Sequence, residues 1–370
     1  MESFSFFEQP NHTIYSFVLF VAINRTGCTE QIYYPPVYAV IMKSIGRHIL
    51  HPLLILIISG AGTLRAENQK MIIYNCNQLA YFEKVPKRAV TVNQSATELL
   101  LALGLADRMI GTAYLDAAIR PDLQADYRKV PVLAAKAPGK EGLLAEEPDF
   151  VYATFGGMFS DASLGSRTFL EQLDIATYVS PVFCNGKKEP LTLDLLLSEI
   201  LEVGEIFQVT DRSQALTRDI RQRIADTSER LAEISKPARV FLFDMDDRTP
   251  YTAGALGPQQ LLLSLAGAEN IFADIQGRMA GVSWEAVLER DPEVILLVDS
   301  VWSSAEHKRE LLQTNPALRT IRAVQEDRLI TLEFPDTMPG VRFGAAVEKL
   351  AQQLYPEQLL TKNDTVVLSH

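Results

Sequence analysis

The sequence has few of the residues that could run a reaction or hold a bare metal ion. Its 370 residues include five histidines and three cysteines, and only His307 and His370 follow residue 66. So few imidazoles exclude a multi-histidine site for zinc or manganese. A Ser-His-Asp arrangement could use only His307, which lies in the charged stretch SAEHKRE. Phosphate-cradling glycine motifs and a Gly-x-Ser-x-Gly turn are also missing, so binding is favoured over catalysis.

Clusters of positive charge are missing as well. The net charge is −11 and no long basic run appears. A nucleic-acid partner is therefore excluded, because neutralising phosphates requires clustered lysine and arginine. The hydrophobic share of 47% and the charged share of 22% are ordinary for a globular protein in water. A chain of this length has enough apolar material for two domains of common size.

The sequence after Met42 has the order of a secretory signal peptide. Positive residues, an apolar stretch and a cleavage site follow one another: Lys43 and Arg47, Ile49 to Ile58, then Leu64-Arg65-Ala66 before Glu67. The apolar stretch is shorter than the roughly 20 residues of a membrane span, although an uncleaved signal anchor is the alternative. We therefore expect residues 42–66 to be a signal peptide that is cleaved near residue 66, which places the protein in the periplasm.

Residues 1–41 are interpreted as an extension that results from start-site choice, with translation beginning at Met42. A lipid on Cys28 is disfavoured, because Arg25 and Thr26 stand where small or aliphatic residues are preferred. Beyond the leader only Cys76 and Cys184 remain. An even pair in an oxidising compartment favours a disulfide, and two buried thiols are the alternative.

Strand and helix patterns alternate along most of the exported chain. The strand patterns are AVTVNQ, RMIGTAY, KVPVL, DFVYAT, ARVFLFDM, EVILLVD and RLITLE, with helical patterns between them. This alternation predicts an α/β fold with parallel sheets. From Thr192 to about Ser235 only helical spacing appears, which indicates one long helix or two nearly in line. We place the N-terminal lobe at 67–190, the backbone helix linker at 191–236 and the C-terminal lobe at 237–370.

One helix–Pro–strand corner occurs twice in the chain. EGLLAEEPDFVYA begins at Glu141 and WEAVLERDPEVILLV begins at Trp284. In both, a leucine follows the glutamate by three residues, and a proline, an acid and an apolar run come after it. The proline stops the helix and turns the chain into a central strand. The repeat therefore indicates equivalent corners in two similar lobes, with Trp284 packing at the start of its helix.

Residues that follow the predicted strands are candidates for ligand contact, because open α/β sheets bind ligands at the carboxyl ends of their strands. They are Asn93, Gln94, Tyr114, Phe155 and Met158 in the first lobe, and Tyr251, Arg278, Trp302 and Arg342 in the second. Aromatic rings with a few arginines suit a large ligand that is anionic or a metal chelate. For each residue taken singly, packing or a surface ion pair is the alternative.

Three stretches resemble a known family. KRAVTVNQSATELLLALGLADRMIG resembles the first lobe of bacterial periplasmic binding proteins for iron–siderophore complexes and vitamin B12. YTAGALGPQQLLLSLAGAENIFAD and VSWEAVLERDPEVILLV resemble the second lobe, and the resemblance covers about Pro86 to Pro356. It implies two Rossmann-like lobes with parallel sheets joined by a single long helix, little closure on ligand binding, and a permease with its ATPase at the inner membrane as partners.

The resemblance also implies one exposed docking glutamate on each lobe. By position these are Glu98, in Ser-Ala-Thr-Glu, and Glu285, in Ser-Trp-Glu-Ala, which would meet arginines of the permease. The alternative is helix-start chemistry, since Ser95 and Glu98 fit a capping box. The sequence departs from the family near Asn93, where a proline is usual, and in the long polar segment FGGMFSDASLGSRTF.

The expected ligand is a ferric siderophore or a similar iron chelate. Iron is expected only as part of that ligand, no cofactor is expected to be covalently bound, and the protein is expected to be a monomer. A corrinoid, haem or another large cofactor is the alternative within the same fold. A two-lobed α/β enzyme is the alternative from another class, because a fold does not decide a function.

Overall fold

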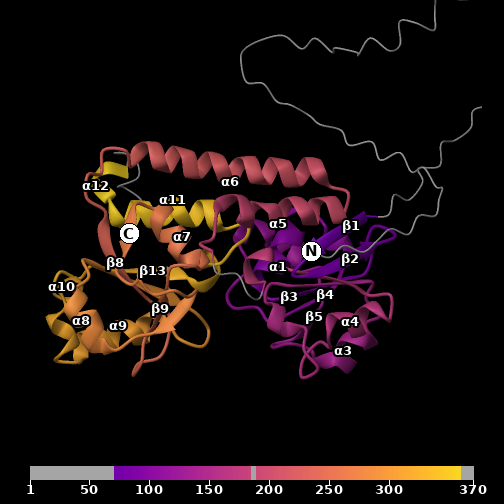
Figure 1. Ribbon diagram of the computed structural model, residues 1–370, viewed down its shortest axis with the longest axis horizontal. Helices are drawn as coiled ribbons and strands as arrows, with labels where there is room; N and C mark the ends of the chain where they lie inside the picture. Colours follow the sequence, from indigo (N-terminus) through magenta and orange to yellow (C-terminus); the bar gives the residue numbers. More distant parts are fainter. Residues whose placement is uncertain (1–70, 185–188, 360–370) are drawn as a thin grey trace, which may run out of the picture. The chain divides into compact units, whose positions relative to one another are not determined.

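The computed structural model describes residues 71–184 and 189–359, which form two α/β lobes and two helices between them (Figure 1). The predicted start-site extension, signal peptide and cleavage site lie outside the described residues. The lobe boundaries that the sequence suggested, at residues 190 and 236, stay predictions.

The first lobe holds a five-stranded parallel sheet with the order β5-β4-β3-β6-β7. Its strands are β3 (Ala89–Val92), β4 (Met109–Ala113), β5 (Val132–Ala134), β6 (Phe150–Ala153) and β7 (Ala176–Val179). One face packs against α1 (Gln94–Ala102) and α5 (Leu193–Ile206), and the other against α3 (Gly139–Ala145) and α4 (Arg167–Glu171). The short α2 (Gln124–Tyr127) follows β4. β3 and β6 are buried along their whole length because helices cover both faces.

The second lobe holds a four-stranded parallel sheet with the order β10-β8-β12-β13. Its strands are β8 (Ala238–Phe243), β10 (Ala268–Asn270), β12 (Val294–Asp299) and β13 (Leu329–Glu333). α7 (Pro258–Leu265) and α11 (Phe343–Leu354) cover one face. α8 (Trp284–Arg290), α9 (Ala305–Thr314) and α10 (Arg322–Gln325) cover the other. The predicted alternation of helices with parallel strands is confirmed in both lobes.

Smaller elements complete the described chain. An antiparallel pair, β9 (Tyr251–Ala253) with β11 (Met279–Gly281), stands beside the four-stranded sheet of the second lobe. The short helix α12 (Pro356–Leu359) follows α11. Short 3-10 turns lie at Ala106–Arg108, Pro121–Leu123, Gly156–Met158, Pro181–Phe183, Leu318–Thr320 and Phe334–Thr337. Two of these turns directly follow β7 and β13, so they shape the ends of those strands.

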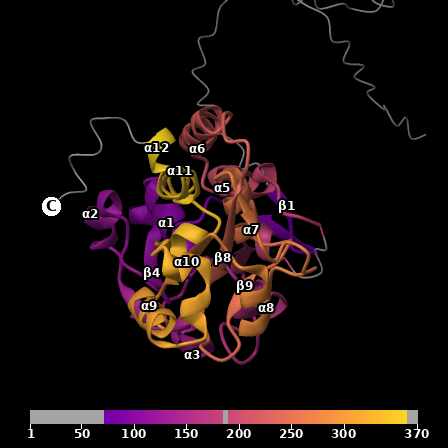
Figure 2. The same cartoon turned by 90° about the vertical axis from the view of Figure 1, so that its left-hand side faces the viewer.

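The chain between the lobes forms two helices that pack side by side. α5 is followed after a short turn by α6 (Thr210–Arg230), which packs on α5 and on α11, and therefore bridges the lobes (Figure 2). The predicted long bridging helix is thus confirmed as α6. The expectation of one continuous helix, or two in line, is wrong. Gly204 lets α6 approach, because a Cβ there would lie 2.1 Å from Ser213 Oγ, and Gln208 (φ 55°) reverses the chain.

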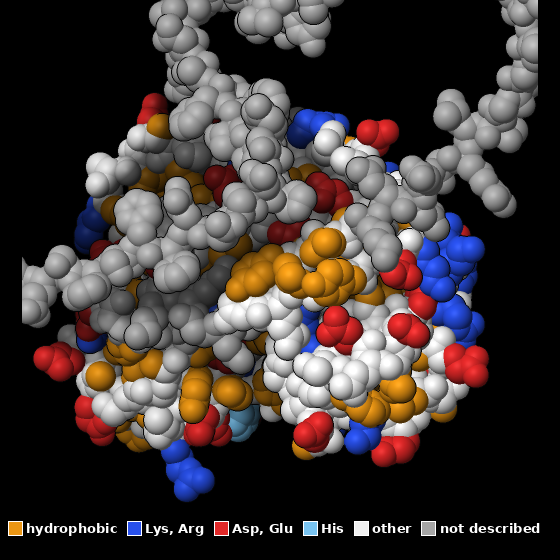
Figure 3. Space-filling model, turned by 45° about the vertical axis from the view of Figure 1, so that its right-hand side comes forward, with side chains coloured by type: hydrophobic (Ala, Val, Ile, Leu, Met, Phe, Trp, Pro, Cys, Tyr) orange, Lys and Arg blue, Asp and Glu red, His pale blue; other side chains and the backbone are white. Residues whose placement is uncertain are grey.

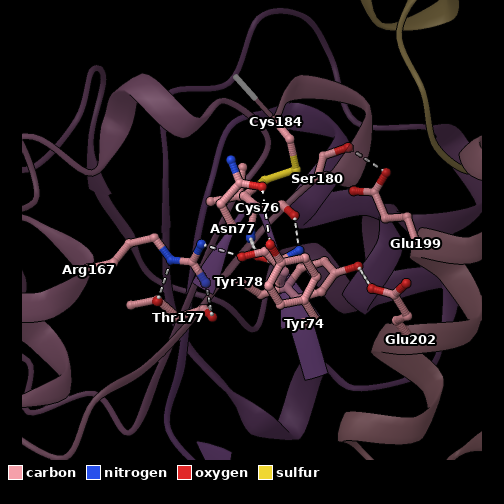
Figure 4. The surroundings of a disulfide bond; sticks show 12 residues. Tyr74, Cys76, Asn77, Arg167, Thr177, Tyr178, Ser180, Cys184, Glu199 and Glu202 are labelled. Atoms are coloured by element: carbon pink, nitrogen blue, oxygen red, sulfur yellow. Dashed lines mark hydrogen bonds between the residues drawn. A yellow bond between two sulfur atoms is a disulfide. The ribbon is translucent and has the colours of Figure 1, made fainter. Parts of the chain in front are cut away.

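A two-stranded hairpin precedes the first sheet. β1 (Met71–Asn75) pairs with β2 (Gln78–Phe82), and both turn residues have positive φ, 50° at Cys76 and 64° at Asn77. Cys76 forms the predicted disulfide with Cys184, which follows β7 (S–S 2.03 Å; Figure 4). The Asn75 amide bonds both the N–H and the C=O of Val179, at 2.9 and 2.8 Å. The hairpin is therefore fastened at the carboxyl end of β7.

The helix–Pro–strand corner has the same backbone path in both lobes. α3 ends shortly before Glu147 (φ 48°) and Pro148, and α8 ends shortly before Asp291 (φ 38°) and Pro292. A residue before proline is disfavoured in the right-handed helical region. The left-handed residue therefore closes each helix and releases the chain into β6 or β12.

An arginine fastens each corner to the strand at the centre of its lobe. Arg88 donates to the last two carbonyl oxygens before Pro148, at 2.7 and 2.6 Å. Arg239 donates to the equivalent oxygens before Pro292, at 3.2 and 2.6 Å. The acid directly after each proline accepts the backbone N–H of that arginine, at 2.8 and 3.1 Å. The interpretation of the repeat as equivalent corners of similar lobes is confirmed.

Candidate functional site

The strand orders place a topological switch point at the carboxyl edge of each sheet. In the first lobe β4 and β6 flank β3, and in the second β10 and β12 flank β8, so the connections leave the central strand in opposite directions. Ligands bind at such points in open α/β sheets. We call the residues that follow β3, β4, β6 and β7 in one lobe, and β8, β12 and β13 in the other, the candidate cleft.

The turn from β3 into α1 is buried and internally bonded. Asn93 and Gln94 are 2% and 1% exposed, and Gln94 Oε1 accepts the N–H of Asp116 at 3.1 Å. Thr154, at the end of β6, accepts the N–H of Ala96 at 3.2 Å. Asn93 (φ 79°) has a buried Oδ1 without a hydrogen-bond partner in the described chain. Gln94 thus holds the loop after β4 in place, and ligand contact by either residue stays a prediction.

The predicted capping box is not formed. The N-cap of α1 is Asn93, two residues before the expected N-cap Ser95, and it makes no side-chain bond to the helix. Left-handed Asn93 turns the chain earlier than a serine cap would. The Glu98 carboxylate instead accepts hydrogen bonds from the side-chain amide of Gln94 at 2.8 Å and from the N–H of Arg120 at 3.1 Å, and it also meets the second lobe.

Glu98 forms a buried ion pair with Arg342 of the second lobe. Arg342 donates through Nε and Nη2 to the two carboxylate oxygens, at 2.7 and 2.6 Å, and Glu98 is 1% exposed. Arg342 also bonds Glu333 and the carbonyl of Ala118, each at 2.7 Å. Burial alone would lower the pKa of Arg342. The hydrogen bonds to Glu98 and the negative charge of Glu98 outweigh burial, so the pKa of Arg342 is raised. Arg342 therefore joins the lobes, and ligand contact by it stays a prediction.

The expected exposure of Glu98 is wrong, because a residue 244 positions later in the chain covers it. Its docking role stays a prediction, and that role would require the ion pair with Arg342 to open. Glu285 differs, since it is exposed in the first turn of α8. Hydrogen bonds from its own N–H and from Ser283 lower the pKa of Glu285. It is therefore ionised and accessible, as the docking role requires.

Two phenylalanines and an arginine from opposite lobes meet at one side of the candidate cleft. The rings of Phe155 and Phe183 lie 4.7 Å apart, centre to centre. Arg278 of the second lobe lies 5.6 Å from the Phe183 ring and donates to the carbonyl of Cys184 at 3.0 Å. Burial lowers the pKa of Arg278. Met158 lies in the turn after β6 and packs partly against the sheet.

The loop after β4 supplies a tyrosine and a poorly solvated acid. Tyr114 (φ 59°) is half-buried and packs against the core of the first lobe. Asp116 is 4% exposed, and burial raises the pKa of its carboxyl group to about 6, although a hydrogen bond with Gln94 opposes the shift. The carboxyl group of Asp116 therefore takes up a proton at a higher pH than an exposed aspartate does.

The second lobe presents an exposed tryptophan after β12. Trp302 is 45% exposed, and its ring lies edge-on to Phe334 at 4.9 Å. Tyr251 is 38% exposed at the start of β9. The structure therefore leaves both of these predicted residues accessible at the surface.

A buried lysine shapes the loop that carries Trp302. Lys308 is fully buried and donates to the carbonyls of Val298 and Ser303, which flank that loop. Burial lowers the pKa of Lys308 to about 8. Burial also raises the pKa of nearby Asp244 to about 6, although the charge of Lys308 opposes this. Lys308 therefore ties together the two ends of the loop that carries Trp302.

The described residues offer little for catalysis or metal binding. His307 Nε2 lies 2.7 Å from Asp247 Oδ2, and both side chains are about half exposed. Among residues 71–184 and 189–359, no group of three or more His, Cys, Asp or Glu side chains could hold a metal ion. No helix in that part of the chain is long and apolar enough to cross a membrane.

Sequence reasoning missed several residues of the candidate cleft: Asp116, Phe183, Asp244, Lys308 and Phe334. Phe183 and Phe334 stand close after β7 and β13, so the strand-end rule that found Phe155 could have found them. Lys308 gave no such signal, because a lysine in an amphipathic helix ordinarily points to solvent.

Comparison with known proteins agrees with this geometry. The profile of a family described as "Periplasmic binding protein" matches residues 90–335. An uncharacterized ABC transporter substrate-binding lipoprotein, YvrC of Bacillus subtilis, is 26% identical over 285 residues, 76% of this chain and 84% of that protein. A vitamin B12-binding protein of Yersinia pestis is 27% identical over 215 residues, 57% of this chain and 69% of that protein.

Solved structures show the same fold. A periplasmic binding protein from Veillonella parvula is 29% identical, with a TM-score of 0.70 over 78% of this chain and 98% of that one. A protein of an ABC-type Fe3+-hydroxamate transport system from Saccharomonospora viridis is 24% identical, with a TM-score of 0.65 over 76% of this chain and 98% of that one. The chain therefore belongs to the periplasmic binding protein family, whose members bind substrates and are not enzymes.

Proposed function

We propose that this protein is the substrate-binding component of an ABC importer, and that it carries a ferric siderophore or a similar iron chelate in the candidate cleft. It would deliver this cargo to a permease and its ATPase at the inner membrane. Iron would be present only inside the chelate. The relative from Bacillus subtilis, an ABC transporter substrate-binding lipoprotein, supports the importer role.

Two clusters of aromatic side chains at the candidate cleft support a bulky chelate as the ligand. The first is Phe155 with Phe183 and the cation Arg278, and the second is Trp302 with Phe334. Flat apolar surfaces with one partly desolvated cation suit a large ligand that has organic faces and polar edges. The ion pair that joins Glu98 to Arg342 favours a cleft that is already shaped before the ligand arrives.

Export supports the same role. The predicted signal peptide would place the protein outside the cytoplasm, and the disulfide fits an oxidising compartment. Because the Bacillus subtilis relative is a lipoprotein, this protein could be anchored to the membrane or free in the periplasm. Either form could serve a permease in the inner membrane.

A corrinoid is the second candidate, because the Yersinia pestis relative binds vitamin B12 and covers 57% of this chain. A corrin ring also presents a large face that could lie against Trp302. The two candidates differ in metal and in ring chemistry, so one ligand panel separates them.

The test is a titration of the exported chain, beginning at Glu67, with ferric siderophores, haem and cobalamin. Tryptophan fluorescence is the readout, since Trp302 is exposed and Trp284 packs on Phe241 and Phe243. We expect saturable quenching at submicromolar concentration with one ferric chelate and much weaker binding of the iron-free chelator.

The matched control is Trp302→Phe, which keeps an aromatic ring and leaves only Trp284 as a reporter. Quenching should largely disappear in this variant, while binding measured by calorimetry should persist. Binding of cobalamin alone would replace the siderophore with the second candidate. If nothing on the panel bound, the proposed cargo classes would both be rejected.

A further inference from the structure

The segment that follows β7 connects the hairpin with the candidate cleft. It consists of residues 181–184, and we call it the cleft wall. The ring of Phe183 lies 4.7 Å from the ring of Phe155, centre to centre, at one side of the candidate cleft. The next residue, Cys184, is buried and forms the disulfide with Cys76 in the turn of the hairpin. One residue of the wall therefore belongs to the cleft, while its neighbour is covalently bound to the hairpin.

The second lobe reaches the cleft wall through Arg278. Its guanidinium donates to the carbonyl oxygen of Cys184 at 3.0 Å and lies 5.6 Å from the centre of the Phe183 ring. The carbonyl accepts this bond only where the backbone at Cys184 is correctly placed, because a hydrogen bond weakens steeply as its distance and angle depart from the ideal. The position of Cys184 therefore decides whether the two lobes meet at this side of the candidate cleft.

The loop that carries Arg278 is fastened within the second lobe. The N–H of Gly254 donates to the carbonyl of Arg278 at 3.0 Å, and the N–H of Leu256 donates to the carbonyl of Gly277 at 2.9 Å. A Cβ at Gly254 would lie 2.4 Å from the carbonyl oxygen of Gly277, so only glycine allows this close approach. The arginine is therefore presented from a fixed backbone, and the cleft wall must come to it.

The hairpin end of the disulfide is fastened as well. The amide of Asn75, the residue before Cys76, bonds both backbone groups of Val179. Arg167 donates to the carbonyl of Asn75 at 2.8 Å and to the hydroxyl of Thr177 at 2.9 Å, and Figure 4 shows it beside the disulfide. The turn of the hairpin is thus tied to the last part of β7, directly before the cleft wall begins.

The turn carries this attachment because the strands of the hairpin do not join the first sheet. β1 and β2 form a sheet of their own, and a hollow of about 440 Å³ is lined by β2, α4 and the start of β7. The outer side chains Ile72 and Tyr74 are 57% and 68% exposed, and Figure 3 shows hydrophobic side chains gathered at the surface on one face of the molecule. The hairpin therefore acts on β7 through its turn, where Asn75 and Cys76 stand.

We propose that the disulfide between Cys76 and Cys184 positions the cleft wall for the cargo. It holds Phe183 in the candidate cleft and keeps the carbonyl of Cys184 within reach of Arg278. The effect on cargo rests on the proposed function, whereas the coupling of the disulfide to Arg278 does not. The disulfide acts through its neighbours and does not touch the cargo. Its contribution is preorganisation, because a wall that is already ordered need not be ordered when the cargo binds.

Reduction of the disulfide tests this role directly. The bond takes up two electrons and two protons to give two thiols, and dithiothreitol supplies them as it forms its own cyclic disulfide. If the oxidised chain binds a cargo more tightly than the reduced chain does, the cargo must oppose reduction by the same factor, because the two equilibria share one cycle. A disulfide that only stabilised the folded chain would leave the cargo affinity of a folded, reduced chain unchanged.

The first measurement needs no cargo. The exported chain, beginning at Glu67, is equilibrated in buffers of reduced and oxidised dithiothreitol, and its free thiols are alkylated and counted by mass spectrometry. Arg278→Ala removes the hydrogen bond to the cleft wall, so the disulfide should become about threefold easier to reduce. The matched control is Arg342→Ala, which also loses a contact between the lobes, but through Glu98. Its disulfide should be reduced as in the original chain, with circular dichroism showing that the reduced chains are folded.

The second measurement compares the affinities of the original chain and of Cys76→Ser/Cys184→Ser for ferric siderophores, haem and cobalamin. We expect the variant to bind the ligand from this panel about tenfold more weakly, because its cleft wall must be ordered on binding. The same ligand should make the disulfide of the original chain about tenfold harder to reduce, a shift of about 30 mV. If the double variant does not fold, Asn75→Ala takes its place. It keeps the disulfide, releases the hairpin turn from Val179, and should weaken binding in the same direction.

Three results would overturn the proposal. Equal affinities of the original chain and the folded variant would show that the disulfide acts on stability alone. A bound ligand that leaves the reduction equilibrium unchanged would show that the cleft and the disulfide are independent. Equally easy reduction in Arg278→Ala and Arg342→Ala would assign the effect to the whole fold. If no ligand of the panel bound, the proposed cargo would fail, while the first measurement would still decide whether Arg278 and the disulfide are coupled.

Discussion

At the amino ends of their central strands, the two lobes share one corner. Arg88 and Arg239 hold the helix ends, and Asp149 and Glu293 accept the backbone N–H groups. At the carboxyl ends the lobes differ. The first presents a phenylalanine pair and the second a tryptophan loop that a buried lysine holds. Similarity is thus confined to the part that builds the sheet, while the part that would meet a ligand has diverged.

The largest effect on stability is expected from the ion pair between Glu98 and Arg342, which joins the two lobes and is not part of the shared corner. Arg342→Ala would leave Glu98 buried without a cation, and we expect the free energy of unfolding to fall by about 3–5 kcal/mol. Urea denaturation measures this loss. The control is Arg221→Ala, which removes an ion pair with Asp194 whose side chains are 49% and 81% exposed and should cost less than about 1 kcal/mol. Similar small losses in both variants would mean that the pair does not hold the lobes.

A buried acid under the first sheet should make stability depend on pH. Burial raises the pKa of Glu199 from 4.5 to about 7, although hydrogen bonds from Tyr152 and Ser180 oppose this. Because the folded pKa exceeds the unfolded one, its contribution is complete below pH 4.5 and is lost as the pH rises through about 7.

The variant Glu199→Gln lacks this titration and should have a flatter pH profile. Over that window the original chain should lose up to about 3 kcal/mol relative to the variant. Denaturant midpoints measured across the pH range test this. Parallel profiles for the two proteins would show that Glu199 titrates at its ordinary pKa.

The shared corner predicts equal effects in the two lobes. Arg88→Ala and Arg239→Ala each remove two hydrogen bonds to the carbonyls at a helix end, in places that are only partly shielded from water. We expect each to lower the free energy of unfolding by about 1 kcal/mol, as measured in urea. A large loss in the free energy of unfolding for one variant and none for the other would show that the two corners are not equivalent.

The smallest effect on stability is expected at Glu285. Glu285→Ala should change the free energy of unfolding by less than about 0.5 kcal/mol, because the side chain is exposed. Under the proposed function it should nevertheless reduce uptake of cargo while binding stays intact. Glu306→Ala is the control, since Glu306 is equally exposed in the first turn of α9 behind a serine cap. Equal uptake by both variants would remove Glu285 from the docking surface.

Local patterns were enough to predict much of the fold. The corners were predictable because proline and its neighbours fix the chain direction within a few residues. The disulfide was predictable because only Cys76 and Cys184 remain beyond the leader. The break between α5 and α6 was harder to place. Its sharpness depends on the contact of Gly204 with Ser213, which a helical pattern does not reveal.

The candidate site was less predictable, because its main features join distant parts of the chain. The burial of Glu98 depends on Arg342, 244 positions away, and on the way in which the two lobes meet. The role of Lys308 depends on carbonyl groups at the end of β12, which carry no sequence signal. Sequence found the exposed Trp302 because it follows a strand, and missed Phe183 although the same rule applied.

The disulfide also turns the first lobe into a covalent ring. The bond joins residues separated by 108 positions, and β2 through β7 lie between them. A single protease cut in any loop of that ring opens the circle but releases no fragment, so the chain keeps its full mass until it is reduced. A cut in the second lobe divides the chain at once. The same nick therefore leaves the first lobe in one piece and divides the chain in the second, which protects the first sheet and its β1–β2 hairpin against proteases outside the cytoplasm.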